Sequence, residues 1–350
     1  MRTDFNIGPI AISGNSKPFV IAEMSGNHNQ SIERAFAIVD AAADSGAHAI
    51  KLQTYTPDTM TIKGNNADFL ISESDSLWSG RNLYDLYSEA YTPWEWHAPI
   101  FDHARKRGII AFSSPFDETA VDFLESLDVP AYKIASFENT DWPLLKKVAS
   151  TGKPVIMSTG VATISDIDGA VRTLRENGCK DLVLLKCTST YPATPENTHL
   201  NTIPHLANLF QCHVGLSDHT KGIGSSIAAV ALGARVIEKH FTLRRSDGGV
   251  DSAFSIEPDE LKALVEESER AFLAMGEISY GVQKVEQKSL QFKRSMYAVK
   301  NIEAGEKFSK ENVRVIRPGN GMKPMFYDII LGRQASKPLK AGTPLTWDNI

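Results

Sequence analysis

Residues 19–54 read FVIAEMSGNHNQSIERAFAIVDAAADSGAHAIKLQT and contain one complete strand–helix–strand unit. The apolar runs at 19–24 and 49–54 have the composition of buried strands. The stretch between them repeats apolar residues at intervals of three and four, as an amphipathic helix does. This order predicts two parallel strands joined by a right-handed helical crossover.

The same unit recurs through the first four fifths of the chain. The eight predicted strands lie at 19–24, 49–54, 109–115, 131–136, 154–159, 182–189, 214–219 and 236–242. Helical patterns alternate with them, such as TISDIDGAVRTLRENG at 163–178, which opens on a capping Thr and closes on glycine. Eight such units predict an α/β fold of the (β/α)8 TIM-barrel type.

One connection is far longer than the others. Residues 54–93 form a stretch of about forty residues between the second strand and the next helix, where a βα loop is usually about 2–6 residues long. Because βα loops lie at the catalytic end of such a barrel, we expect this insertion to be a lid or a specificity element.

The C-terminal part carries an internal repeat. AVKNIEAGEKFSKENV at 298–313 aligns with ASKPLKAGTPLTWDNI at 335–350, with an offset of 37 residues. Two copies of a turn-rich unit predict a small pseudo-symmetric domain, since a solenoid needs about three repeats. We therefore expect a barrel domain at 1–280, a linker at 281–293 and a small domain at 294–350.

Composition narrows the class of protein. The 350 residues are 42% hydrophobic and 23% charged, which is ordinary for a globular chain. With 37 basic and 42 acidic residues and no basic tract, a nucleic-acid partner is not expected. The N-terminus lacks a signal-peptide pattern and no stretch reaches about 18 apolar residues, so we expect a cytoplasmic protein without a membrane partner. Three cysteines without C-x-x-C spacing favour small core residues over disulfides or structural zinc.

Polar side chains gather where the predicted strands end. Side chains alternate along a strand, so residues two apart at its C-terminal end share a face that can point into the barrel mouth. This reasoning collects Glu23, Lys51, Gln53, Ser114, Lys133, Ser136, Ser217, His219, Glu238 and His240. Some of them, Ser114 and Ser136 above all, could instead be hydrogen-bonded core residues or helix caps.

Two histidines suggest a metal. His219 and His240 end adjacent strands, which lie about 4.8 Å apart, so both imidazoles can reach one ion. Without a cysteine, the pair favours an open site for Mn²⁺ or Mg²⁺, with Co²⁺ as a further candidate, over closed zinc. His28, in GNHNQ after the first strand, is either a third functional histidine or a donor that stabilises a turn.

Two lysines suggest an anionic ligand. Lys51 and Lys133 lie in apolar strands, where an unpaired ammonium is costly, so each needs an anionic partner such as a phosphate or a carboxylate. Lys133 could alternatively form a Schiff base. The glycine-rich stretch SDHTKGIGSS at 217–226 has the form of an anion-binding loop before a helix.

The ordered strand-end motifs resemble the sialic acid synthase family. They read IAEMSGNHNQ, KLQTY, SSPFD, YKIAS, LKCTSTYP, GLSDHT and EKHFT, and the C-terminal RPGNG with the A-G-x-x-L repeat resembles the antifreeze-like (SAF) domain. This family condenses phosphoenolpyruvate with an aldose to give a nine-carbon 2-keto acid and phosphate. The resemblance therefore implies a transferase that forms a carbon–carbon bond.

Two segments resemble one branch of that family. LWSGRNLYDLYSEAYTPWEW at 77–96 and LRRSDGGVDSAFSIEP at 243–258 are similar to the branch that makes pseudaminic acid. The implied sugar is 2,4-diacetamido-2,4,6-trideoxy-β-L-altropyranose. The alternatives are the N-acetylneuraminic and legionaminic acid branches, a Schiff-base aldolase using Lys133, and a sugar-binding protein without catalysis.

The resemblance also assigns roles to residues. Phosphoenolpyruvate would be bound by Lys51, Ser114, Lys133, Ser136, Ser189 and Ser217, with Ser189 where relatives commonly have Asn. Sugar contacts would come from Gln53, Glu138, Tyr191, Asp251 and Arg317, and the metal ligands would be His219 and His240. Glu23 is the expected catalytic carboxylate, with Glu238 in reserve. The expected assembly is a domain-swapped homodimer in which Arg317 reaches the partner's barrel.

Overall fold

The structure, a computed structural model, describes residues 3–64, 66–72 and 77–350. The chain splits into two compact units, Met1–Gly276 and Glu277–Ile350, and each is described by itself. The domain boundaries expected at 280 and 293 stay predictions.

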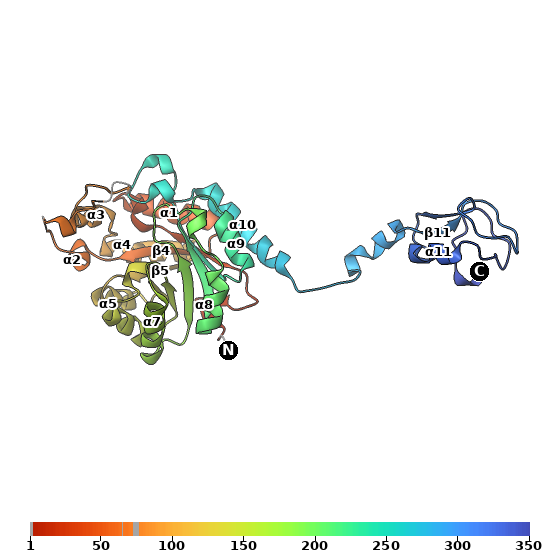
Figure 1. Cartoon of the computed structure of the whole chain (residues 1–350). Coiled ribbons are helices and arrows are strands. Elements are labelled where there is room, and N and C mark those ends of the chain that lie inside the picture. Colours follow the sequence, from red (N-terminus) through yellow and green to blue (C-terminus); the bar gives the residue numbers. More distant parts are fainter. Residues whose placement is uncertain (1–2, 65, 73–76) are drawn as a thin grey trace. The chain divides into compact units, whose positions relative to one another are not determined.

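The first unit is a closed barrel of eight parallel strands, as the sequence predicts (Figure 1). Around the barrel each strand pairs with its neighbour in the sequence, and β10 closes the ring against β3. The strands are β3 (Phe19–Glu23), β4 (Ala49–Thr54), β5 (Ile110–Pro115), β6 (Tyr132–Ile134), β7 (Val155–Ser158), β8 (Leu182–Cys187), β9 (His213–Asp218) and β10 (Val236–His240). Several end earlier than predicted, because the chain turns into a loop at the barrel mouth.

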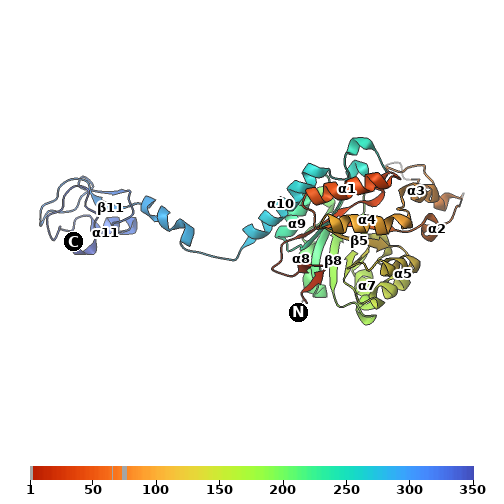
Figure 2. The same ribbon diagram turned by 180° about the vertical axis from the view of Figure 1, so that it is seen from behind.

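Helices surround the strands, as Figure 1 and the reverse view in Figure 2 show. They are α1 (Ile32–Asp44), α4 (Trp94–Lys106), α5 (Glu118–Ser126), α6 (Trp142–Ser150), α7 (Ile164–Glu176), α8 (Thr202–Phe210), α9 (Gly224–Ala231) and α10 (Pro258–Met275). Local sequence sets their starts. The Thr163 side chain accepts from the Asp166 amide, and the Asp166 side chain accepts from the Thr163 amide, which makes a capping box at the start of α7.

Two parts of the barrel unit were not predicted. A short antiparallel hairpin, β1 (Phe5–Ile7) with β2 (Ile10–Ile12), precedes the barrel and buries Ile7 and Ile12. The long insertion contains helices α2 (Pro57–Met60) and α3 (Leu83–Ala90). Its residues 65 and 73–76 lie outside the described residues.

The second unit is built around the repeat. Strands β11 (Ser295–Ala298) and β12 (Val313–Ile316) pair antiparallel, and a short helix, α11 (Tyr327–Ile330), follows. Backbone hydrogen bonds join equivalent positions of the two repeats in both directions. Ile302 and Leu339 exchange backbone hydrogen bonds of 2.8 Å, while the Gly305 amide donates to Ala335 and the Gly342 amide to Ala298. The small domain is therefore pseudo-symmetric in its hydrogen bonding. The segment before it contains a 3₁₀ helix, η7 (Lys284–Phe292), where the sequence suggested a polar bridge.

Among the residues that the structure describes, no helix is both long enough and apolar enough to span a bilayer.

Candidate active site

The first two barrel strands bring a buried ion pair to the mouth. The Lys51 ammonium on β4 lies 2.5 Å from Glu23 Oε2 on β3, and both side chains are almost fully buried. Gln53 Nε2 donates to Glu23 Oε1 at 3.0 Å, and Lys51 donates to Ser114 Oγ at 3.1 Å. The alternation along β4 thus points Lys51 and Gln53 into the barrel, as expected.

A second lysine–carboxylate pair lies opposite. Lys133 on β6 is 3.4 Å from Glu238 Oε1 on β10, and Glu238 Oε2 is 3.7 Å from Lys51. Ser217 Oγ donates to Glu238 at 3.0 Å, and Lys133 donates to Ser158 Oγ at 2.8 Å. Two cations and two carboxylates therefore alternate in one buried cluster at the centre of the mouth.

Burial and charge act against one another on this cluster. Burial raises the pKa of Glu23 to about 7, although the Lys51 charge lowers it. Burial also opposes ionisation of Glu238, but Lys133 and Lys51 hold the pKa of that carboxyl below its ordinary value. The pKa of Lys133 is lowered by burial. Of the two carboxylates in this cluster, Glu23 is thus the one whose pKa lies nearer to neutrality, as a general base requires.

The two candidate metal ligands lie side by side. The rings of His219 and His240 have centroids 5.4 Å apart. His219 Nδ1 donates to the Thr188 carbonyl at 3.0 Å, which leaves the lone pair on Nε2. Burial, together with the neighbouring His219, lowers the pKa of His240 well below its ordinary value, so this ring is neutral.

These two rings fit a divalent ion. Neutral imidazole nitrogens are common ligands for such ions, and neither Glu23 nor Glu238 is free to join them because both face lysines. Within residues 3–64, 66–72 and 77–350, no group of three or more His, Cys, Asp or Glu side chains could hold a metal. Water and substrate oxygens would therefore have to complete the coordination.

Two of the serines expected to bind phosphoenolpyruvate, Ser136 and Ser189, lie near Cys187. Cys187 Sγ lies 3.6 Å from Ser189 Oγ and 3.8 Å from His219 Nδ1. A side chain at Gly160 would collide with Ser189 Oγ at 2.1 Å and Ser136 Oγ at 2.6 Å, so glycine keeps this space open. Although burial raises it, the pKa of the Cys187 thiol is lowered to about 6 by the positive charge of protonated His219. Although burial lowers the pKa of His219, Cys187 in turn raises it, and a proton on both ring nitrogens would exclude a metal from this ring.

Aromatic rings enclose the histidines. Tyr191 lies 4.4 Å from His219 between ring centroids, and Phe254 lies 4.9 Å from His240. Trp78, from the long insertion, adds a third ring 5.8 Å from Tyr191. Asp251 Oδ2 is 3.9 Å from His240 Nδ1. The expected sugar-contacting residues Tyr191 and Asp251 therefore line the same side of the mouth.

Glu138 and Arg317 are placed differently. Burial raises the pKa of Glu138 to about 7. The charge of Lys133 has the largest effect in the opposite direction and lowers this pKa. Among the described residues, none donates a hydrogen bond to its buried Oε2. Arg317 belongs to the second unit, where it is exposed directly after β12.

His28 has a structural role. Its Nδ1 accepts from the Gln30 amide at 3.2 Å, so Nε2 carries the proton and donates to Thr92 Oγ1 at 3.1 Å. Both ring nitrogens are thus used inside the fold, which favours the turn-stabilising alternative over a ligand.

Sequence reasoning missed three residues of the site. Ser158 is the last residue of β7 and Ser114 lies one residue before the end of β5, and this similar place near a strand end could have identified Ser158. Cys187 was expected only as a small core residue, yet it is buried beside His219. For Trp78, the sequence offered no motif or spacing that predicts a functional role, apart from its position in the long insertion.

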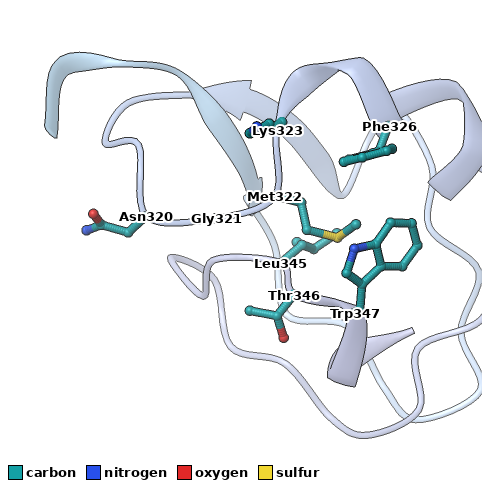
Figure 3. A pocket seen from close by; sticks show the side chains of 8 residues that line it. All are labelled: Asn320, Gly321, Met322, Lys323, Phe326, Leu345, Thr346 and Trp347. Atoms are coloured by element: carbon teal, nitrogen blue, oxygen red, sulfur yellow. The ribbon is translucent and has the colours of Figure 1, made fainter. Parts of the chain in front are cut away.

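The second unit has a cavity of its own. It measures about 340 Å³, and Phe326 and Trp347 face one another across it, with ring centroids 5.2 Å apart (Figure 3). Asn320 and Gly321, from the RPGNG segment that carries Arg317, also line it.

A TIM barrel whose mouth gathers two buried lysines, two carboxylates and two histidines has the arrangement of charges and donors typical of an enzyme active site. Comparison with known protein families identifies the class of this enzyme more precisely. The chain belongs to the NeuB family, whose model matches residues 38–280, and residues 293–350 match the SAF domain.

Curated relatives and solved structures agree with this assignment. The chain is 46% identical to a pseudaminic acid synthase of Campylobacter jejuni, over 94% of this chain and 95% of that protein. It is 44% identical to the pseudaminic acid synthase of Helicobacter pylori, over 95% of this chain and 98% of that protein. The crystal structure of an N-acetylneuraminic acid synthetase from Leptospira borgpetersenii, solved with citrate, superposes with a TM-score of 0.74 at 32% identity, over 83% of this chain and 96% of that one.

Proposed function

We propose that this chain condenses phosphoenolpyruvate with 2,4-diacetamido-2,4,6-trideoxy-β-L-altropyranose and water, giving pseudaminic acid and phosphate. The observation that carries the proposal is the buried cluster of Lys51, Lys133, Glu23 and Glu238 beside the two histidines. The choice of sugar is supported by the relatives named pseudaminic acid synthase, which are 44–46% identical over nearly the whole chain.

The lysines suit a substrate with two anionic groups. Phosphoenolpyruvate carries a phosphate and a carboxylate, and Lys51 and Lys133 are two buried ammonium groups in one cavity mouth. Ser114 bonds to Lys51 and Ser217 to Glu238, and Ser136 and Ser189 lie beside Gly160, so their hydroxyls would be further donors in our assignment. Holding both anionic groups fixes the enol carbon for attack, so positioning supplies much of the rate.

The reaction has two bond-forming steps. Carbon 3 of the enol phosphate attacks the aldehyde of the open-chain sugar, the carbonyl π bond breaks and its oxygen takes up a proton to become a hydroxyl, which leaves a cation-like carbon 2. Water then adds at carbon 2 and loses a proton to a base. The bond between carbon 2 and the phosphate oxygen then breaks, phosphate leaves with the electron pair, and the new hydroxyl loses its proton to give the 2-keto group. Glu23, with its pKa raised to about 7, takes the proton from water in our assignment, and Glu238 balances the lysine charges.

A divalent ion on His219 and His240 would supply Lewis-acid polarisation of the sugar carbonyl. We propose Mn²⁺ or Mg²⁺, with Co²⁺ as a further candidate, because two imidazoles without a thiolate ligand suit an open site. Tyr191 and Phe254 pack on the two rings and exclude water around them.

The alternatives have less support. The segments 77–96 and 243–258 resemble the branch that makes pseudaminic acid, which argues against assigning this chain to the N-acetylneuraminic or legionaminic branch. For a Schiff-base aldolase, Lys133 would have to leave its contacts with Ser158, at 2.8 Å, and Glu238, at 3.4 Å. A sugar-binding protein without catalysis leaves the buried lysine–carboxylate cluster without a use.

We also propose a domain-swapped homodimer in which Arg317 reaches the sugar in the partner's barrel. The resemblance supports this role, and the exposed position of Arg317 leaves its guanidinium available. The cytoplasmic location stays a prediction.

One experiment tests the proposed reaction directly. Purified protein is incubated with phosphoenolpyruvate, Mn²⁺ and each of three sugars: the altro-configured diacetamido sugar, the legionaminic precursor and N-acetylmannosamine. Mass spectrometry should detect the nine-carbon acid chiefly from the first sugar, with one phosphate released per product. Product from either other sugar at equal or higher kcat/KM would contradict the proposal.

A further inference from the structure

A buried ion pair lies on the outer face of the barrel, directly behind the two histidines. The Lys239 ammonium on β10 is 3.0 Å from Asp218 Oδ2 on β9, and both side chains are almost completely inaccessible to solvent. Asp218 and Lys239 are also partners in the parallel register of these two strands. The reaction derived above does not use either residue.

Each member of this pair adjoins one histidine in the sequence. Asp218 precedes His219, and Lys239 precedes His240. Because side chains alternate along a strand, an outward Asp218 and Lys239 place the two histidines on the inward face. A bond between the two outward residues therefore fixes how far apart the two inward rings stand.

The pair also shapes the turn that carries His219. Asp218 Oδ1 accepts from the Thr220 amide at 2.9 Å and from its hydroxyl at 2.7 Å, and Ser226 donates to Oδ2 at 2.6 Å. Lys239 Nζ donates to the Thr220 carbonyl at 2.6 Å. The residues on both sides of His219 are thus held by one network, which also includes the first turns of α9.

A buried ion pair gives little net stability compared with well-packed apolar residues, and its best-attested use is to specify one arrangement of the chain. The network here is fully bonded and joins the two strands that carry the histidines. We infer that Asp218 and Lys239 are positioning residues that set the spacing of His219 and His240 for a divalent cation. This inference rests on the metal site of the proposed function.

The test compares the affinities for two ligands. The double variant Asp218→Asn, Lys239→Met removes both charges without leaving one buried and unpaired. Mn²⁺ binding is measured from the free-ion electron paramagnetic resonance signal, without substrate. Phosphoenolpyruvate binding is measured by calorimetry without metal. We expect Mn²⁺ affinity to fall by about tenfold or more. Phosphoenolpyruvate affinity should fall clearly less, because its two lysines, Lys51 and Lys133, lie on other strands and only Ser217 and Glu238 adjoin the altered pair.

A matched control separates positioning from stability. His48 precedes β4 at the opposite end of the barrel, and its Nδ1 accepts from the Val20 amide at 3.0 Å. His48→Ala should lower the thermal midpoint and leave Mn²⁺ affinity unchanged. If the double variant does not fold, Ser226→Ala, which removes one hydrogen bond to Asp218 and keeps the ion pair, is judged by the same two affinities.

The outcomes distinguish the inference from the proposed function. Wild-type Mn²⁺ affinity in a folded double variant would overturn the positioning role and leave the proposed reaction intact. Equal losses of both affinities, accompanied by a lower thermal midpoint, would also overturn it, since the pair would then support the barrel in general. A wild-type protein that does not bind Mn²⁺ would overturn the metal site and this inference together.

Discussion

The indole Nε1–H of Trp78 donates to the carbonyl oxygen of Val250 at 3.0 Å, joining two segments that are 172 residues apart in the chain. Trp78 belongs to the insertion after β4, and Val250 to the loop after β10. The same indole lies against Tyr191, whose ring packs on His219. The two segments that distinguish the branch of the family therefore meet beside the expected sugar site.

Replacing this indole should alter the choice of sugar. In Trp78→Ala, we expect kcat/KM for the altro-configured diacetamido sugar to fall by about tenfold or more, because one wall of the sugar site is lost. The KM for phosphoenolpyruvate should change by less than about twofold, since Lys51 and Lys133 are untouched. Steady-state kinetics with that sugar and with N-acetylmannosamine would measure both effects.

Trp142 supplies the control, because it lies on α6 and packs against Gly169. Trp142→Ala should retain the sugar preference of the wild type. An unchanged ratio of kcat/KM for the two sugars in Trp78→Ala would remove Trp78 from the sugar site.

The two carboxylates of the cluster should respond differently to neutralisation. Glu23→Gln should lower kcat by about 10²–10⁴-fold if Glu23 takes the proton from water. Glu238→Gln should mainly raise the KM for phosphoenolpyruvate, because Glu238 fixes Lys133 and Ser217. Calorimetry should still detect phosphoenolpyruvate binding to Glu23→Gln. A larger loss of kcat in Glu238→Gln would exchange the two roles.

Buried histidines should make the barrel sensitive to acid. His97 Nδ1 donates to the Pro93 carbonyl at 3.2 Å, so Nε2 accepts from Thr54 Oγ1 at 2.8 Å and the ring is neutral. Burial lowers its pKa to about 4 from the ordinary 6.5. Between these values the unfolded chain binds a proton that the folded chain does not. Stability is therefore lost as the pH falls through this window, by about 2 kcal/mol between pH 7 and pH 5.

Urea unfolding at pH 7 and pH 5 would measure this effect. His97→Gln should be less stable at pH 7 but should lose about 2 kcal/mol less on acidification. The exposed His205 gives a matched variant, His205→Gln, which should keep the wild-type loss. If His97→Gln and the wild type lose the same free energy of unfolding, another group controls the acid response.

Much of the barrel could be predicted from the sequence because its signals are local. Apolar runs identified the strands, and alternation placed Lys51, Gln53 and Glu23 in one mouth before any contact was known. The N-terminal hairpin was missed because strands of three residues carry almost no pattern. Helix α3 was missed because the insertion that contains it was treated as a loop.

The rest of the site depends on contacts between distant segments. The Trp78–Val250 hydrogen bond and the Lys133–Ser158 contact depend on how loops and strands meet in space. The spacing of apolar residues along the sequence does not predict such contacts. Cys187 is buried and free, as expected of a small core residue, but only its distance from His219 shows that it lies beside the site.

Activity should depend on a divalent metal. Exhaustive chelation should abolish condensation, and Mn²⁺ should restore it, because in the proposed site only His219 and His240 would hold the ion, which could therefore be exchanged. His240→Ala should remain folded by circular dichroism and be nearly inactive. Full activity in chelated protein, shown by elemental analysis to contain no metal, would rule out a metal role.

The last prediction concerns the small domain. If each Arg317 completes the partner's site, His240→Ala and Arg317→Ala should both be nearly inactive alone and should complement one another when mixed. Equal amounts that reassort at random give about half heterodimers, each with one intact site of two, so activity should recover to about a quarter of the wild type in a closed two-fold dimer. Subunit exchange must first be demonstrated by mixing two differently tagged chains and recovering dimers that carry both tags. Exchange without recovery would mean that each small domain serves its own barrel, or that Arg317 does not contribute to the site.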